Sequence, residues 1–159
     1  MMVRKATVED ARALALIIAA VAEEGSIGTE PPVDVEARAE RYRELIAEGG
    51  LAAAWVLDDG GAVVGGASVR ERARGVLYVG MSVLPDARGR GGGRAFLDAI
   101  VEHARVGGAH KVELEVWVDN ARAIALYVSS GFEVEGLRRN HYRRRDGRLR
   151  STLVMARLL

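Results

Sequence analysis

An apolar segment, a glycine-rich loop and a helix-forming segment follow one another directly between Met81 and Leu97, and this junction constrains the fold most strongly. The loop contains three arginines and four glycines: Arg88, Gly89, Arg90, Gly91, Gly92, Gly93 and Arg94. A loop that opens a helix presents backbone N–H groups that no intrahelical carbonyl can accept, beside the positive end of the helix dipole. Glycines let a ligand approach this backbone, and arginines can pair with phosphate oxygens. The sequence therefore predicts an anion site, typically for a phosphate, at the end of a strand.

The spacing of these glycines excludes two common phosphate-binding motifs. A P-loop ends in Gly-Lys-Ser/Thr, but Gly93 is followed by Arg94. The dinucleotide fingerprint G-x-G-x-x-G, started at Gly89, requires a glycine where Arg94 stands. The pattern that does fit is R-x-x-G-x-G, formed by Arg88, Gly91 and Gly93. The alternative is an ordinary glycine-rich turn with solvated arginines.

A second motif follows about 30 residues later, in a segment whose pattern predicts a short helix. It comprises Asn120, Ala123, Leu126-Tyr127 and Gly131-Phe132. Together with the R-x-x-G-x-G pattern, it resembles the sequence blocks of the GNAT superfamily of acyl-CoA N-acetyltransferases. The resemblance extends along the chain and is strongest from residue 76 to 136. It implies a GNAT-type fold with acetyl-CoA as cosubstrate and no metal.

The resemblance also implies roles for individual residues. The backbone around Val83 would hold the pantetheine arm, and the loop from Arg88 to Arg94 would hold the pyrophosphate. Asn120 is similar to a cofactor-contacting asparagine, and Tyr127 to the tyrosine that donates a proton to the departing CoA thiolate. Each has a purely structural alternative, because Asn120 also suits a helix N-cap and Tyr127 also suits a packed aromatic.

The chain departs from the family pattern at the general base. Many GNAT relatives carry a glutamate on the strand before the glycine-rich loop, but residues 77–82 contain no carboxylate. Four glutamates remain as candidates, two on the next predicted strand and two between the first predicted helices: Glu113, Glu115, Glu24 and Glu30. Each is equally explained as a solvated charge, so the base stays open.

Hydrophobic periodicity predicts a mixed α/β fold. Strands are expected near residues 3–6, 51–57, 62–69, 76–83, 111–118 and 151–159, and helices near 11–22, 34–48, 94–107 and 119–131. Thr7 and Asp10 resemble a capping box before the first helix, and Asp34 is predicted to be the N-cap of the second. A hairpin signal at residues 58–61 and a charged turn at Arg70 to Gly75 predict three consecutive antiparallel strands. Residues 76–118 form a βαβ unit, so its two strands should be parallel around the pyrophosphate-binding helix. His103 lies on the apolar stripe of that helix and is predicted to be a core-edge histidine.

Length and composition narrow the class of protein. A chain of 159 residues, 49% of them hydrophobic, is expected to form one domain over residues 1–159. It has no cysteine, which excludes disulfides, thiolate metal sites and cysteine nucleophiles. We see neither a signal-peptide pattern nor an apolar run of roughly 18 residues, so a cytoplasmic protein without membrane contact is expected.

The net charge of +1 conceals an uneven distribution, because seven arginines and only one acid, Asp146, lie between Arg138 and Arg150. This segment is predicted to be a hairpin near the acceptor entrance or a subunit contact, which leaves a homodimer open. Nucleic-acid binding is not favoured, since Tyr142 is the only aromatic residue among the arginines that could stack on a base.

From these features we predict an N-acetyltransferase that moves an acetyl group from acetyl-CoA to a primary amine by direct attack, without a covalent enzyme intermediate. The acceptor would be a small molecule, an amino-acid-like compound or a protein N-terminus. Two other classes stay open. One is a sensor module that binds CoA without turnover, consistent with the missing base, and the other is an arginine-rich RNA-binding protein.

Overall fold

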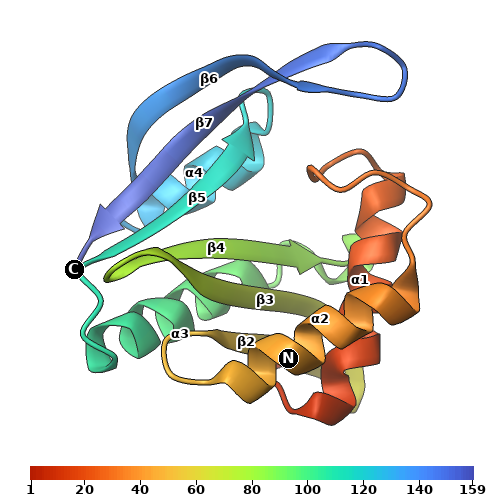
Figure 1. Cartoon of the computed structure of the whole chain (residues 1–159), viewed down its shortest axis with the longest axis vertical. Helices are drawn as coiled ribbons and strands as arrows, with labels where there is room; N and C mark the ends of the chain where they lie inside the picture. The colour runs from red at the N-terminus through yellow and green to blue at the C-terminus, as the bar shows by residue number, and fades with distance from the viewer.

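The computed structural model describes all residues from 1 to 159 and contains one seven-stranded sheet with helices on both faces (Figure 1). The strands are β1 Met2–Lys5, β2 Ala53–Asp59, β3 Ala62–Ala73, β4 Val76–Val83, β5 Lys111–Trp117, β6 Glu133–Arg143 and β7 Leu149–Leu158. The α-helices are α1 Ala11–Glu23, α2 Val35–Glu48, α3 Gly92–Val106 and α4 Ala121–Ser129, with short 3₁₀ turns at Val8–Asp10 and Pro85–Ala87. No helix is both long enough and apolar enough to cross a membrane.

The strands lie in the order β1-β2-β3-β4-β5-β7-β6, and β4 and β5 are the only parallel neighbours. The chain passes from β4 through α3 into β5, so the predicted βαβ unit is confirmed, together with the mixed α/β class and the antiparallel N-terminal strands. The β2–β3 hairpin turns where the sequence predicted. There the Gly61 N–H donates to Asp58 Oδ1 at 2.7 Å, and Gly60 and Gly61 adopt φ of +69° and +95°, which glycine tolerates without strain.

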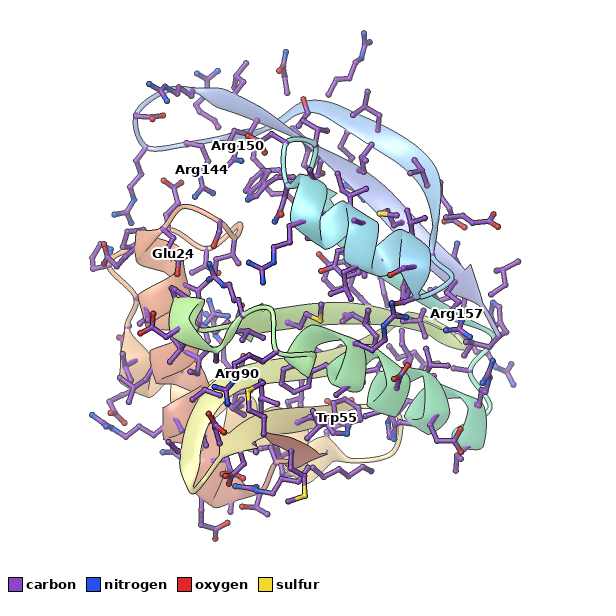
Figure 2. The ribbon with its side chains drawn as sticks, turned by 180° about the vertical axis from the view of Figure 1, so that it is seen from behind. Glu24, Trp55, Arg90, Arg144, Arg150 and Arg157 are labelled. Carbon is purple, nitrogen blue, oxygen red and sulfur yellow. The ribbon has the colours of Figure 1, made fainter.

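Strand β2 is buried on both faces and shows how the helices cover the sheet. Trp55 and Leu57 belong to the main core cluster with Phe96 of α3. Val56 points to the opposite face, as alternation along a strand requires, and clusters with Leu14 of α1. Figures 1 and 2 show α1 and α2 on that face, with α3 and α4 on the other. The sheet is therefore the middle of three layers.

Local signals at the helix starts act as the sequence predicted. The Asp34 carboxylate accepts a hydrogen bond from the Ala37 N–H at 2.9 Å and caps α2. The Asp10 carboxylate reaches back to the Thr7 N–H at 2.8 Å before α1. Asp10 also accepts two hydrogen bonds from the Arg4 guanidinium, which lower the pKa of this carboxyl to about 2.

The segment from Arg70 to Gly75 is not the charged turn that the sequence predicted. Strand β3 continues through Ala73, and only the next two residues form the turn. Arg70 pairs with Tyr78 across the β3–β4 ladder, and the Arg72 guanidinium lies 4.1 Å from the centre of the Tyr78 ring. Charged side chains are compatible with an exposed strand when cross-strand partners of this kind are present, so charge alone was a poor indicator of a turn.

His103 occupies the core edge, as predicted. Its ring meets the Trp55 ring edge-on with centroids 5.2 Å apart, and Nε2 lies 3.2 Å from the Leu51 carbonyl oxygen. Desolvation by burial lowers the pKa of His103, which keeps the ring neutral in this position. The contacts of His103 are accounted for by packing.

Candidate functional site

The parallel strands β4 and β5 pair over only three residues each, from Val76 to Tyr78 and from Lys111 to Glu113. Beyond Tyr78, β4 stays paired with β3, while β5 follows β7 away from it, as Figure 1 shows. The edge of β4 that faces β5 is therefore unpaired toward Val83. A cavity of about 790 Å³ lies at this opening and is lined by residues of β4, β5, α4 and the glycine-rich loop.

The glycine-rich loop leads from β4 into α3 and leaves its backbone donors free. Gly91 caps the helix with φ of +88°, and Gly89 has φ of +80°, conformations that favour glycine. The N–H groups from Gly89 to Arg94 donate to no protein acceptor. Such N–H groups at a helix start can bind an anion.

Gly92 and Gly93 lie close to leucine side chains of β2 and α4. A Cβ on Gly92 would lie 2.4 Å from Leu57 Cδ2, and a Cβ on Gly93 would lie 2.8 Å from Leu126 Cδ2. Both distances are shorter than any tolerated carbon contact. These glycines thus hold the start of α3 close to β2 and α4.

The three arginines of the loop each contact neighbouring protein groups, although Arg90 and Arg94 stay exposed to solvent. The Arg88 guanidinium donates to the Val83 carbonyl through Nε at 2.8 Å and forms an ion pair with Glu24 at 2.9 Å. Arg90 forms an ion pair with Asp59 at 2.8 Å. Arg94 donates to the carbonyl oxygen and the hydroxyl of Ser129 at 2.9 and 2.6 Å.

Asn120 and Tyr127, the two residues singled out in the second motif, both line the cavity. Asn120 Oδ1 accepts the Ala123 N–H at 3.1 Å and so caps α4, the structural alternative that the sequence also allowed. Tyr127 is 8% exposed and packs against Phe132 with ring centroids 6.0 Å apart. Burial raises the pKa of the Tyr127 hydroxyl to about 12, so it remains protonated near neutral pH and can donate a proton.

Of the four candidate glutamates, Glu115 is the one that lines the cavity. Its side chain is 8% exposed, and its Oε2 accepts hydrogen bonds from the Tyr142 hydroxyl at 2.7 Å and the Thr152 hydroxyl at 3.0 Å. The Arg138 Nε lies 3.5 Å from Oε1. These contacts fix a carboxylate at the cavity wall, on the far side of the opening from β4.

The other three glutamates form ion pairs outside the cavity wall. Glu113 pairs with Arg72 at 3.5 Å, and Glu24 pairs with Arg88 as described above. Glu30 pairs with Arg144 at 3.9 Å and also accepts the Arg145 backbone N–H at 3.0 Å. The structure thus distinguishes Glu115 from the three alternatives that the sequence could not separate.

Three further residues line the cavity that were not predicted as site residues: Tyr78, Tyr142 and Thr152. Tyr142 lies on β6 and Thr152 on β7, and they reach Glu115 because β7 pairs with β5. The alternation of side chains along β7 was the only signal that could have placed Thr152 on this face. The strand near residues 151–159 was predicted, but its pairing with β5 had no signature in the sequence.

The arginine-rich hairpin of β6 and β7 contacts the loop between α1 and α2. Arg144 donates to the Gly28 carbonyl at 2.9 Å and the Ile27 carbonyl at 3.3 Å, and Arg150 donates to the Gly25 carbonyl at 2.9 Å. Figure 2 shows both arginines on the side of the hairpin that faces the end of α1. Part of this loop lines the cavity, so the hairpin lies beside the cavity, and its place at an acceptor entrance stays a prediction.

Trp117 connects the hairpin arginines to the cavity. It is 5% exposed at the end of β5, although it lies on the same face of the strand as Glu113 and Glu115. The Arg150 and Arg144 guanidinium carbons lie 4.0 and 5.3 Å from its ring centroid, and Tyr142 meets the ring edge-on. These cation–π contacts explain how an indole can be buried on a face rich in charge.

Similar proteins agree on one family. Residues 18–132 match the Acetyltransferase (GNAT) family. A "[Ribosomal protein bS18]-alanine N-acetyltransferase" of Escherichia coli is 41% identical over 76 residues, 48% of this chain, so the chain spans about half (51%) of that relative's length. An L-methionine sulfoximine/L-methionine sulfone acetyltransferase of Pseudomonas paraeruginosa is 33% identical over 128 residues, 77% of this chain and 74% of the relative.

Solved structures support the same assignment over the whole chain. A ribosomal-protein-alanine N-acetyltransferase from Brucella melitensis superposes with a TM-score of 0.89 at 31% identity, covering 100% of both chains. The structure of yncA from Salmonella typhimurium, solved with its cofactor acetyl-CoA, has a TM-score of 0.89 at 27% identity and covers 100% of this chain and 94% of its own. With its R-x-x-G-x-G loop, its diverging parallel strands and this match, the chain belongs to the acetyltransferase (GNAT) family.

Proposed function

We propose that residues 1–159 act as a single N-acetyltransferase domain that transfers an acetyl group from acetyl-CoA to a primary amine. The observation that carries this proposal is the cavity between β4 and β5, which has free backbone donors at one end and Tyr127 and Glu115 along its walls. Acetyl-CoA supplies the activated acyl group as a thioester. The acceptor would be an amino-acid-like small molecule or a peptide N-terminus, since relatives of both kinds are found.

The cofactor-binding residues are proposed from their positions. The free N–H groups from Gly89 to Arg94 would bind the pyrophosphate at the start of α3. The unpaired edge of β4 toward Val83 would pair with the amide groups of the pantetheine arm, as an added strand would. The Arg88 ion pair with Glu24 lies beside this path, so Arg88 would exchange Glu24 for a phosphate oxygen when the cosubstrate binds. Asn120 would contribute from the start of α4.

Two side chains are proposed to move protons during acetyl transfer, one at the attacking amine and one at the departing sulfur. An amine attacks a thioester only as the neutral base, so a carboxylate that accepts its proton promotes the reaction. Glu115 is the carboxylate available at the cavity wall, directly or through one water. Tyr127, whose hydroxyl is protonated at neutral pH, would donate its proton to the departing sulfur. No enzyme nucleophile is needed, because the amine attacks the carbonyl directly.

The test is thiol release from saturating acetyl-CoA with a panel of amines, alongside thermal unfolding with and without acetyl-CoA. We expect stabilisation by acetyl-CoA and thiol release with at least one amine. Stabilisation without release from any amine would indicate the sensor module, and no stabilisation would contradict the cofactor assignment.

Glu115→Gln isolates the base, because it keeps the side-chain volume and an oxygen for Tyr142 while removing the proton acceptor. We expect turnover to fall roughly a hundredfold or more, the scale of a positioned acid or base. The matched control is Glu113→Gln, two residues earlier on the same face of β5 but outside the cavity wall. Equal effects of the two changes would remove the assignment of Glu115.

A further inference from the structure

A second cavity, of about 490 Å³, lies between α2 and β3. Three arginines line it, Arg38 and Arg41 from α2 and Arg70 from β3, together with Tyr42 and Ser68. Arg38, Tyr42 and Ser68 also line the main cavity, so the two spaces share a wall. Any acceptor bound in the main cavity therefore has this second space beside it.

The charge of the second cavity is not neutralised by the protein. Arg38 donates to the Thr29 hydroxyl at 3.3 Å and Arg70 to the Arg41 carbonyl at 3.4 Å, both long contacts to neutral acceptors. None of the three arginines forms an ion pair, although 13 ion pairs form elsewhere in the chain. The single acid in the lining is Glu44, which is exposed and pairs with none of them. Three cations around one space thus lack an anionic partner.

The cavity lies at the acceptor end of the cleft and not at the pyrophosphate end. In the β3–β4 ladder, Arg70 is opposite Tyr78 and Ser68 is opposite Gly80. Tyr78 is the last residue at which β4 pairs with β5, so the opening between these strands begins there. Val83, next to the glycine-rich loop, is five residues further along, about 17 Å at the rise of a strand. Arg70 is therefore too distant to serve the pyrophosphate.

We propose that this second cavity is an anion subsite that binds a carboxylate of the acceptor, so that the preferred acceptors are amines that carry a negative charge. The carboxylate can come from a free amino acid or from an acidic side chain near a peptide N-terminus. Guanidinium groups suit it because they donate to both oxygens of a carboxylate at once. The subsite rests on the proposed acetyl transfer and names its class of acceptor.

The experiment compares matched acceptors that differ in one carboxylate: leucine against leucinamide, and Ala-Glu-amide against Ala-Gln-amide, in the thiol-release assay. Each kcat/KM is expressed per concentration of neutral amine, because an α-carboxylate also raises the pKa of the leucine amine. We expect the charged member of at least one pair to have a kcat/KM tenfold or more higher, which is 1.4 kcal/mol. The leucine pair reports an α-carboxylate and the dipeptide pair an acidic side chain. In Arg70→Glu the preference should disappear, with the affinity for acetyl-CoA unchanged.

The control is Arg105→Glu, the same charge change on exposed residue 105 of α3, on the opposite face of the sheet. It should keep the wild-type preference. Equal rates for both members of both pairs in the wild type overturn the subsite and leave the proposed function intact. No thiol release with any amine overturns the proposed function. In that case the subsite is tested by calorimetry on the complex of the protein with CoA, which compares the affinities for N-acetylglutamate and N-acetylglutamine. Equal affinities overturn the subsite.

Discussion

Two arginine-rich segments border the same cavity and use their charge in opposite ways. In the loop from Arg88 to Arg94, the backbone N–H groups make no hydrogen bond to protein, while the side chains turn to neighbours such as Asp59. In the hairpin from Arg138 to Arg150, the side chains provide the contacts, with Arg144 and Arg150 donating to carbonyls of the α1–α2 loop. The loop therefore leaves its backbone N–H groups free for a ligand, whereas the side chains of the hairpin hold the α1–α2 loop.

The difference shows that arginine content alone does not identify an anion site. Buried arginines that bond backbone carbonyls have little capacity left for a ligand, because each N–H donates to one strong acceptor at a time. Glycine-rich backbone at a helix start keeps its donors available. The arginines of the second cavity differ from both segments. They form no ion pair, make at most long hydrogen bonds to neutral acceptors, and lie next to the cleft.

The largest predicted effect tests whether proton transfer depends on a side chain outside both arginine-rich segments. Tyr127→Phe keeps the packed ring against Phe132 and deletes only the hydroxyl. We expect turnover to fall roughly a hundred- to ten-thousandfold, about 3 to 5 kcal/mol, with acetyl-CoA affinity nearly unchanged, because the donor acts as the thiolate departs. The measurements are thiol release at saturating acetyl-CoA and calorimetry of cofactor binding. Turnover within about threefold of wild type, roughly 0.65 kcal/mol, would make Tyr127 a packing residue.

The second prediction compares one glycine from each segment in the same backbone conformation. Gly91 and Gly147 have φ of +88° and +84°, and a Cβ on either would meet no atom within 4 Å. Valine at either site should cost a similar 1 to 3 kcal/mol of backbone strain, roughly. At a hundredfold excess over its dissociation constant, acetyl-CoA should stabilise the wild type and Gly147→Val by about 2.7 kcal/mol. Gly91→Val should lose most of that gain.

Unfolding in denaturant with and without acetyl-CoA measures both quantities in one experiment. Adding Arg88→Ala to Gly91→Val should remove what stabilisation is left. If acetyl-CoA stabilises Gly91→Val as much as Gly147→Val, then the backbone of the loop is not the binding element and the contrast between the segments fails.

The sequence predicted those parts of the molecule whose cause is local. The cap at Asp34, the hairpin at Asp58 to Gly61 and the strand–loop–helix junction each depend on residues within a few positions of one another. The loop glycines were predicted for the same reason. The region from Arg70 to Ala73 failed because its strand depends on a partner, β4, and not on its own polarity.

The base could not be chosen from the sequence because its environment is assembled from distant segments. Glu115 differs from Glu113 through its partners, above all the hydroxyls of Tyr142 and Thr152, which lie 27 and 37 residues away. The two glutamates have the same residue type, strand and face. Pairing of β7 with β5, which brings Thr152 to Glu115, is a property of strand order that local periodicity does not contain.

The third prediction tests the structural role of the hairpin with two adjacent arginines. The Arg144 side chain is 10% exposed and bonds two carbonyls, whereas Arg143 is exposed and has no polar partner. Arg144→Ala should lower the free energy of unfolding by about 1.5 to 2 kcal/mol, the scale of hydrogen bonds from a charged donor. Arg143→Ala should stay within about 0.5 kcal/mol of wild type. Equal losses in urea unfolding would mean that the hairpin does not hold the α1–α2 loop.

The smallest predicted effect is the affinity of the hairpin for RNA, which separates the structural role from the nucleic-acid alternative. Five of its seven arginines already contact protein acceptors: Arg138, Arg144, Arg145, Arg148 and Arg150. Only Arg139 and Arg143 are left to neutralise phosphates, so log K should fall with log salt at a slope no steeper than about −1.4 for single strands. Fluorescence anisotropy with labelled single-stranded RNA between 50 and 200 mM salt measures this slope. Submicromolar, sequence-dependent binding at physiological salt would show that the arginines leave their carbonyl partners for RNA, and the two segments would then both be anion sites.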